Sequence, residues 1–352
     1  MSSGLKRALP KPGKGSHEPE PISIIIAARN EAQNLPRLLT SLAQLHPYSA
    51  AYEVIIVNDH STDESMEILN NWAGQFGIRV LDFQDEIPGL IGKKAALQKG
   101  IEAASFDILA FTDADCIIPP TWLDEISRVM DPETDYLLGY STILAEENES
   151  SLTLVNFERS IYYILAAAGI SNHRPITASA CNMIYRKSLF EKAGGFQGIG
   201  HLPSGDDDLM LIKLMPFIRK ACYNPAPAMQ ITSIEGRSIA KHFNKNIRRA
   251  SKFRYHPPYL KALSAFVFLY FCMFYAALIL LVAGRGDFLL LGVVGLKSAL
   301  ELAISQQHLA LAHKTHLGIL YFTQILIFPL QFVFYAIRGS LGRYQWKGTS
   351  QS

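Results

Sequence analysis

The sequence contains no charged side chain between Ala262 and Gly284. Because an α-helix rises 1.5 Å per residue, a helix over this run is about 34 Å long and can cross the roughly 30 Å hydrocarbon core of a bilayer. A buried helix of a soluble domain is the alternative, but such helices rarely stay uncharged for about six turns. The run therefore predicts a membrane-spanning helix.

Two further apolar segments follow this run. Leu317–Ile337 is also uncharged and long enough to span, and Pro329 within it predicts a kinked helix packed against protein. The shorter segment between the two runs, residues 288–304, carries Lys297 and Glu301 at a spacing that allows an ion pair on one helix face. This middle segment either spans the membrane or lies in its interface. The predicted membrane region is thus 262–337, with two or three helices.

Basic residues predict the orientation of the spans. Seven basic residues and no acidic residue lie from Lys241 to Lys261, and Arg338, Arg343 and Lys347 follow the last run. The positive-inside rule places both flanks in the cytoplasm, which requires an even number of crossings and favours two spans with an interfacial middle segment. We therefore expect a multi-pass protein, of a cell inner membrane, whose preceding domain is cytoplasmic.

The composition and the termini add further limits. Lys and Arg total 33 against 31 Asp and Glu, and a net charge of +2 indicates no nucleic acid partner. The four cysteines lack a CxxC spacing, so the sequence predicts neither a zinc site nor a disulfide framework. Residues 1–20 are rich in Pro, Gly and Lys without an apolar stretch, which predicts a disordered tail. A basic tail is expected over 338–352.

Residues 21–236 alternate strand-like and helical patterns. Ile22–Ala28 is almost continuously apolar, as in a parallel strand buried on both faces, and four leucines at helical spacing follow over residues 35–42. The pattern predicts later strands at 52–59, 78–83 and 106–115, and later helices at 64–76 and 92–104. This order predicts an α/β fold with a doubly wound, mixed but mainly parallel sheet, in which ligands bind at the carboxyl ends of the strands.

Polar side chains collect where the predicted strands end. They are Asn30 and Glu31 after the first strand, Asn58 and Asp59 at the second, and Asp113 and Asp115 at the fourth. Neighbouring carboxylates repel one another unless a cation lies between them, and Mg²⁺ or Mn²⁺ binds carboxylates together with phosphate oxygens. No glycine-rich phosphate loop follows the first strand, so a phosphate group would depend on a metal and on side chains such as Lys93 and Lys94. Solvated surface lysines are the alternative interpretation of this pair.

Six motifs, in order, resemble those of the family 2 glycosyltransferases, which have the GT-A fold. They are "PISIIIAARNEAQNL", "VIIVNDHSTDES", "GKKAALQKGI", "TDADC", "CNMIYRKSLFEKAGGF" and "GDDDLMLIKL", within residues 21–252. The resemblance implies a GT-A domain over 21–236 that transfers a sugar, with inversion, from a nucleotide-diphosphate sugar to a lipid-linked or glycan acceptor. It also implies a divalent cation, Mg²⁺ or Mn²⁺, and a place in cell envelope glycan biosynthesis.

The resemblance assigns roles to individual residues. Asp113 and Asp115 are implied to hold the metal, and Asn182 and Arg248 to lie on the acceptor side. The nucleotide sugar is implied to contact a set of residues at the strand ends and at the third helix: Ala28, Asn30, Glu31, Asp59, Lys93 and Asp113.

The catalytic base is expected in "GDDDL". Alignment to the family places it at Asp207, with Asp206 as its neighbour, and a shift by one residue to Asp208 is open. The alternative is purely local, because Ser204 with Asp207 forms a variant of the capping box and acidic first turns are common in helices. A carboxylate opposite the metal is what removal of the acceptor's proton requires.

Two departures from the family pattern bear on the acceptor. Ala180 and Cys181 precede Asn182 where members often have a glycine, which leaves less room. "KNIRR" at 245–249 keeps Arg248 but lacks the Gln and Trp of the Gln-x-x-Arg-Trp motif, which favours a single-sugar transferase over a processive polymerase.

Residues 237–253 show apolar residues on one helical face and basic residues on the other. This pattern predicts a helix in the plane of the lipid headgroups, within a linker over 237–261, and an ordinary connecting helix is the alternative. For the whole chain, a non-catalytic GT-A-like membrane scaffold that binds a nucleotide sugar or a partner protein is the second hypothesis. A nucleotidyltransferase is the third, and it normally shows the glycine-rich loop that this sequence lacks.

Overall fold

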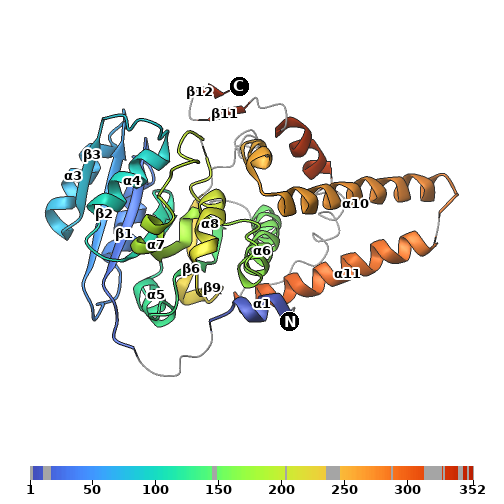
Figure 1. Cartoon of the computed structure of the whole chain (residues 1–352), viewed down its shortest axis with the longest axis horizontal. Coiled ribbons are helices and arrows are strands. Elements are labelled where there is room, and N and C mark those ends of the chain that lie inside the picture. The colour runs from blue at the N-terminus through green and yellow to red at the C-terminus, as the bar shows by residue number, and fades with distance from the viewer. Residues whose placement is uncertain are drawn as a thin grey trace. The chain divides into compact units, whose positions relative to one another are not determined.

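The computed structural model describes residues 3–10, 17–144, 149–202, 204–234, 246–286, 288–312, 327, 330–339, 344–346 and 349–351 (Figure 1). Contacts divide the chain into two compact units. The first contains 1–147, 158–235 and 311–314, and the second contains 148–157, 236–310 and 315–352. The division at 235/236 lies next to the boundary expected from the sequence.

The helices and strands alternate as the sequence predicts, and the bounds of the first two strands agree with the prediction. The helices are α1 (Ser3–Ala8), α2 (Leu35–Ala43), α3 (Ser65–Phe76), α4 (Lys93–Ala103), α5 (Trp122–Val129), α6 (Glu149–Ser171), α7 (Lys187–Lys192), α8 (Asp208–Leu214), α10 (Pro258–Val282) and α11 (Phe288–Leu311). The strands are β1 (Ile22–Ala28), β2 (Tyr52–Asp59), β3 (Arg79–Phe83), β4 (Ile108–Asp113), β5 (Cys116–Ile117), β6 (Tyr136–Gly139), β7 (Ser141–Leu144), β8 (Met183–Arg186), β9 (Ala221–Asn224), β10 (Ile231–Ile234), β11 (Tyr344–Trp346) and β12 (Thr349–Gln351).

A mixed, mainly parallel sheet is the centre of the first unit. Within the described residues it has seven strands in the order β3-β2-β1-β4-β8-β6-β9. β1 pairs in parallel with β2 and β4, and β8 is antiparallel to both of its neighbours. The carboxyl ends of β1, β2 and β4 therefore lie at one edge of the sheet, as the sequence predicts. The expected fold class is confirmed.

Helices cover both faces of this sheet, because successive strand residues point to opposite sides. Ile24 and Ile26 belong to the core formed with α2, α3 and α5. Ile25, between them, belongs to the core formed with α1, α4, α6, α7 and α8. All three isoleucines are fully buried, and each such side chain stabilises the fold by about 1.5–3 kcal/mol.

The N-terminal segment differs from the expected disordered tail. Residues 3–8 form α1, and Leu5 and Ala8 are buried in the core that contains α4 and α6. A helix of six residues with two buried apolar side chains is too short to give a clear periodic pattern in the sequence. His17 also contacts the domain, since its ring Nε2 lies 2.8 Å from the Ser127 carbonyl oxygen.

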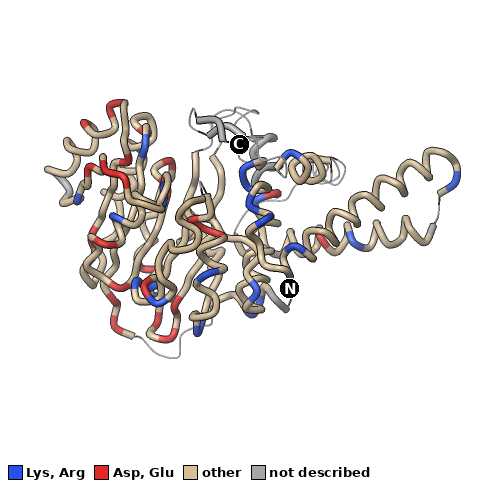
Figure 2. The backbone as a smooth tube through the Cα atoms, turned by 45° about the horizontal axis from the view of Figure 1, so that its top comes forward, with Lys and Arg blue, Asp and Glu red and all other residues tan. Residues whose placement is uncertain are grey.

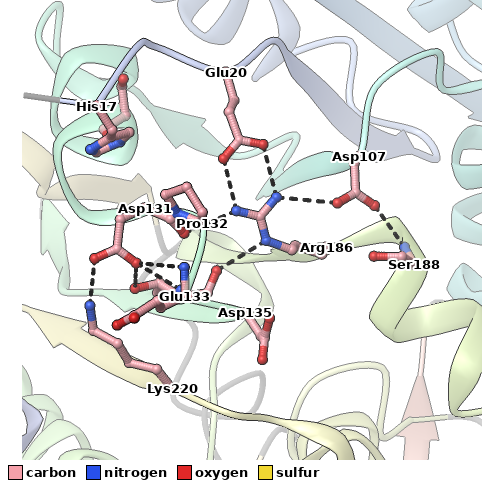
Figure 3. Close-up of polar contacts among 12 residues, drawn as sticks. His17, Glu20, Asp107, Asp131, Pro132, Glu133, Asp135, Arg186, Ser188 and Lys220 are labelled. Atoms are coloured by element: carbon pink, nitrogen blue, oxygen red, sulfur yellow. Dashed lines mark hydrogen bonds and ion pairs between the residues drawn. The ribbon is translucent and has the colours of Figure 1, made fainter.

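Charged side chains form a cluster at the amino ends of the central strands (Figure 3). Arg186, at the end of antiparallel β8, donates to both oxygens of Glu20 at 2.9 Å and to Asp107 at 3.2 Å. It also donates to the carbonyl oxygens of Thr134 and Asp131. Its forked guanidinium thus links the segment before β1, the residue before β4 and the turn before β6.

Two neighbouring pairs complete this amino-end cluster. Arg219 contacts Asp135 with its side chain, at 2.6 Å, and with its backbone N–H. Lys220 contacts Asp131, also at 2.6 Å. Burial raises the pKa values of Asp131 and Asp135, but hydrogen bonds with these cations and with backbone N–H groups outweigh burial, so both pKa values lie below the ordinary value.

The second unit contains α10 and α11. Both helices are long and apolar enough to cross a membrane by length and composition, and their tubes carry few charges over most of their length (Figure 2). Lys297 and Glu301 form the expected ion pair at 2.6 Å, and the Lys297 ammonium lies 4.8 Å from the centre of the Tyr270 ring. α11 and α10 therefore contact each other through this cation.

The middle apolar segment is longer than expected. The apolar pattern ends near residue 304, but α11 continues to Leu311, because the intervening Ser, Gln and His side chains do not interrupt a helix. By length and composition it is thus a second candidate span. Of the later run, 317–337, only 327 and 330–337 lie among the described residues, and 330–339 are helical. Of the amphipathic pattern at 237–253, residues 237–245 lie outside the described residues.

Candidate active site

Lys93 connects two acidic segments that are far apart in the sequence. Its ammonium pairs with Asp113, the last residue of β4, and lies 3.2 Å from Oδ2 of Asp206, just before α8. The three side chains are between 15% and 35% exposed, so the cluster is open to solvent on one side. The structure thus brings the predicted metal-binding strand end and the predicted catalytic segment to one place.

The electrostatics of Lys93 follow from this position. Burial lowers the pKa of its ammonium, but the charges of Asp113 and Asp206 and their hydrogen bonds to it outweigh burial and raise the pKa above its ordinary value. Lys93 is therefore a cation at physiological pH. A single ammonium is shared between carboxylates from two different elements.

Lys94, the next residue, faces the protein interior. It is 1% exposed, and its ammonium donates to the carbonyl oxygens of Leu202 and Ser204. Lys94 thus holds the loop that leads to Asp206, and it does not add charge near a diphosphate as the sequence suggested. A signal was present in the sequence: Lys94 lies three and seven residues before Leu97 and Ile101, on the apolar face of α4.

Asp207 is the N-cap residue of α8. Its Oδ1 accepts from the backbone N–H of Asp208 at 2.7 Å, and Gly205, two residues earlier, has a φ of 97°, which a glycine adopts without strain. The local alternative considered for this residue is therefore a real structural role. This capping bond uses the Oδ1 atom of Asp207.

The residues at the ends of β1 and β2 that are expected to bind the donor contact side chains of neighbouring residues. Asp59 is 5% exposed and its Oδ1 lies 2.8 Å from Nδ1 of His60. Ala28 is fully buried at the end of β1, opposite Asn58 in register. Asn58 donates to Asp82 at 2.7 Å, while its own Oδ1 is buried and has no hydrogen-bond partner among the described residues. This oxygen at the strand end could accept a hydrogen bond from an N–H or O–H group of a ligand.

Asn30 and Glu31 lie in the turn after β1 and bind the loop after β2. Asn30, with a φ of 53°, accepts the N–H of Thr62 at 2.7 Å and donates its own N–H to Ser61 at 3.0 Å. The backbone N–H of Glu31 donates to Ser65 at 2.9 Å. These contacts join the two loops into one rim at the carboxyl edge of the sheet.

Asp115 follows Asp113 after one residue, on the turn into β5. Its backbone oxygen accepts from Ile234 of β10 at 2.9 Å, and its carboxylate is partly exposed. Within the residues that the structure describes, no group of three or more His, Cys, Asp or Glu side chains is arranged to hold a metal. Any cation held here would depend on a pair of carboxylates together with ligand oxygens.

Asn182 lies inside the protein and not at the surface of a cleft. It is fully buried, accepts from Trp122 Nε1 at 3.0 Å, and donates to the carbonyl oxygens of Tyr140 and Met229 at 3.0 and 2.7 Å. Gly139 packs directly on this amide and has no room for a Cβ. Asn182 thus joins three segments, and its expected place on the acceptor side remains a prediction. Arg248 belongs to the second unit, and its acceptor-side role remains a prediction.

Comparisons with known proteins add to this geometry. A family model described as glycosyl transferase family 2 matches residues 23–194. The chain is 29% identical over 194 residues to glycosyltransferase AglE of Haloferax volcanii, which covers 53% of this chain and 58% of that protein. It is 32% identical over 128 residues to an undecaprenyl-phosphate 4-deoxy-4-formamido-L-arabinose transferase of Pseudomonas fluorescens, which covers 36% of this chain and 35% of that protein. The chain thus spans less than two thirds of either relative.

A solved structure is similar over most of its length. It is that of mannosyltransferase PcManGT from Pyrobaculum calidifontis in complex with GDP-Man and Mn²⁺, with a TM-score of 0.58. The likeness covers 96% of this chain and 92% of that chain at 20% sequence identity. At this identity the comparison concerns the fold.

Proposed function

We propose that the chain, whose residues 23–194 match a glycosyl transferase family 2 model and whose fold is of the GT-A type, transfers a sugar from a nucleotide-diphosphate sugar to a membrane-associated acceptor. The observation that carries the proposal is the contact of Lys93 with both Asp113 and Asp206. It joins the strand end that is expected to hold the metal to the segment that is expected to hold the catalytic base. The proposed transfer inverts the anomeric centre and adds one sugar at a time.

A divalent cation, Mg²⁺ or Mn²⁺, fits the residues at the end of β4. The carboxylate of Asp113 is 35% exposed and already accepts a cation, the Lys93 ammonium, while Asp115 offers a second partly exposed carboxylate. Carboxylate oxygens are the ligands that both metals prefer. Asp113 and Asp115 would hold the ion, which when bound would stabilise the negative charge of the leaving diphosphate.

The chain's own side chains supply the other parts of the reaction. Asp207 accepts the proton of the acceptor hydroxyl, as the family alignment implies, and its capping bond keeps the carboxylate in one orientation. Asp206 orients Lys93. The rim formed by Asn30, Glu31 and Asp59 binds the base and ribose of the donor.

The acceptor is proposed to be lipid-linked or a glycan at the membrane. Two candidate spans, α10 and α11, follow the domain, and basic residues without acidic ones precede α10. One relative is named for transfer involving undecaprenyl phosphate, and the solved neighbour binds GDP-Man and Mn²⁺. We infer a multi-pass protein whose catalytic domain is cytoplasmic.

The direct test is to incubate the detergent-solubilised chain with a panel of nucleotide sugars and Mn²⁺ and to measure release of nucleoside diphosphate. We expect release with one donor, its loss in excess EDTA, and its loss in Asp113→Asn. Asp124→Asn is the matched control, because Asp124 is a 51% exposed carboxylate on α5.

Two outcomes would contradict this proposal. Full activity in excess EDTA would remove the metal from the mechanism. Donor binding without any turnover, over the whole panel and with lipid phosphates present, would favour the non-catalytic scaffold.

A further inference from the structure

The cation that the structure places at Asp113 is part of the protein itself. The Lys93 ammonium pairs with Asp113 and lies 3.2 Å from Asp206. The proposed metal uses the same carboxylate. Lys93 and a divalent ion would thus be two cations for one binding position.

The backbone around Lys93 is held in place by neighbouring contacts. Lys93 is the first residue of α4, after Gly92 with a φ of 59°. Lys94, its neighbour, is buried and bound to the carbonyl oxygens of Leu202 and Ser204. The start of α4 is therefore fixed against the loop that carries Asp206, and the ammonium reaches both carboxylates from an anchored backbone.

We propose that Lys93 is an internal counter-ion that competes with the divalent cation for Asp113 and gives way only when the donor diphosphate arrives. This inference rests on the proposed function. Two cations on one carboxylate repel each other strongly in a partly buried site. The diphosphate brings negative charge to which the displaced ammonium can pair, so metal and donor enter together and metal alone binds weakly.

The competition predicts two opposite effects from one substitution. Lys93→Met removes the competing charge, so the free protein should bind Mn²⁺ about tenfold more tightly or better, without any nucleotide present. The same variant should bind inorganic pyrophosphate more weakly at saturating Mn²⁺, because the ammonium that pairs with it is gone. A structural role for Lys93 would not move the two affinities in opposite directions.

The measurement uses the full chain in detergent, with free Mn²⁺ followed by electron paramagnetic resonance and pyrophosphate binding followed by calorimetry. Lys99→Met is the matched control, because Lys99 lies on the same helix, is 41% exposed and pairs with Glu102 at 3.9 Å. It should leave both affinities unchanged. Lys93→Gln replaces Lys93→Met if the latter has a lowered melting temperature.

The outcomes separate this inference from the proposed function. Mn²⁺ affinity in Lys93→Met that equals or falls below the wild-type value overturns the competition. If Asp113→Asn then still abolishes Mn²⁺ binding, the metal site of the proposed function stands and only the counter-ion role fails. If Asp113→Asn leaves Mn²⁺ binding intact, the metal is not held at Asp113 and both fail.

Discussion

The two ends of the central sheet hold their charges in different ways. At the amino ends, Arg186 binds Glu20 through both carboxylate oxygens and adds Asp107 and two carbonyl groups. At the carboxyl ends, the tip of a single lysine is shared between Asp113 and Asp206. A planar guanidinium fork fixes its partners in one arrangement, whereas an ammonium is a point charge on a flexible stem. We therefore expect Arg186 to act as a permanent clamp at the amino ends, and the contacts of Lys93 at the carboxyl ends to be exchangeable.

Substitutions at the acidic start of α8 sharpen the functional side of this comparison and should have the largest effect. We expect Asp207→Asn to lower kcat by about 10² to 10⁴, the usual contribution of a general base. Its melting temperature should change little, since Asn caps helices as well as Asp does. Asp206→Asn should mainly raise the donor KM, because Asp206 orients Lys93.

The kinetic constants and the melting temperature must be measured on the same preparations. A loss of kcat in Asp206→Asn with normal turnover in Asp207→Asn would move the base to Asp206. Normal turnover in both variants, and in Asp208→Asn, would remove the catalytic claim for this segment.

The clamp at the amino ends should show up in stability rather than in catalysis. Arg186→Met leaves two carboxylates and two carbonyl groups without their donor, and we expect a loss of about 3 kcal/mol in the free energy of unfolding. Turnover per folded molecule should be unchanged. Chemical denaturation in detergent, with activity measured before unfolding, checks both statements.

Arg128→Met is the matched control for this clamp. Arg128 is 48% exposed and pairs with Glu125 within one helix at 2.8 Å, a geometry worth about 0.5 kcal/mol. Equal losses in the two variants would mean that Arg186 is no more than a surface ion pair.

The smallest expected effect concerns acid pH. The pKa of Asp135 is lower in the folded protein than its ordinary value, so its charge stabilises the fold above the unfolded-chain pKa of about 3.9. That contribution disappears as the pH falls through the lower folded value. Asp135→Asn should therefore lower stability by about 1 kcal/mol at pH 7 and flatten the decline in melting temperature below about pH 4. An unchanged decline would show that Asp135 does not contribute to it.

The sequence predicts the amino-terminal half of the sheet better than the other half. β1, β2 and β4 are buried on both faces, so they appear as continuous apolar runs that end in polar residues. β6, β8 and β9 have four residues each and depend on partners from distant segments, which leaves little local pattern. The strand-end residue Asp113 is identifiable from the sequence for the first reason.

Residues with long-range partners were harder to interpret from the sequence. Asn182 bonds to Trp122, Tyr140 and Met229, and no local pattern reports that these groups meet. Lys94 could have been separated from Lys93 by the helical spacing of Leu97 and Ile101, since only one of two adjacent residues can share that face. The capping role of Asp207 was readable because caps are local.

The packing of Gly139 on Asn182 has a consequence for protein engineering. A side chain at 139 would enter the space of the Asn182 amide, and any larger residue at 182 would meet the strand that ends at Gly139. The residues that are tolerated at position 139 therefore depend on the residue at position 182, and the reverse also holds. A library that randomises either position alone should return almost only the parent residue, whereas joint randomisation gives a smaller residue at 182 the chance to accompany alanine at 139. Attempts to redesign acceptor preference should leave this pair intact and begin from the more exposed loops.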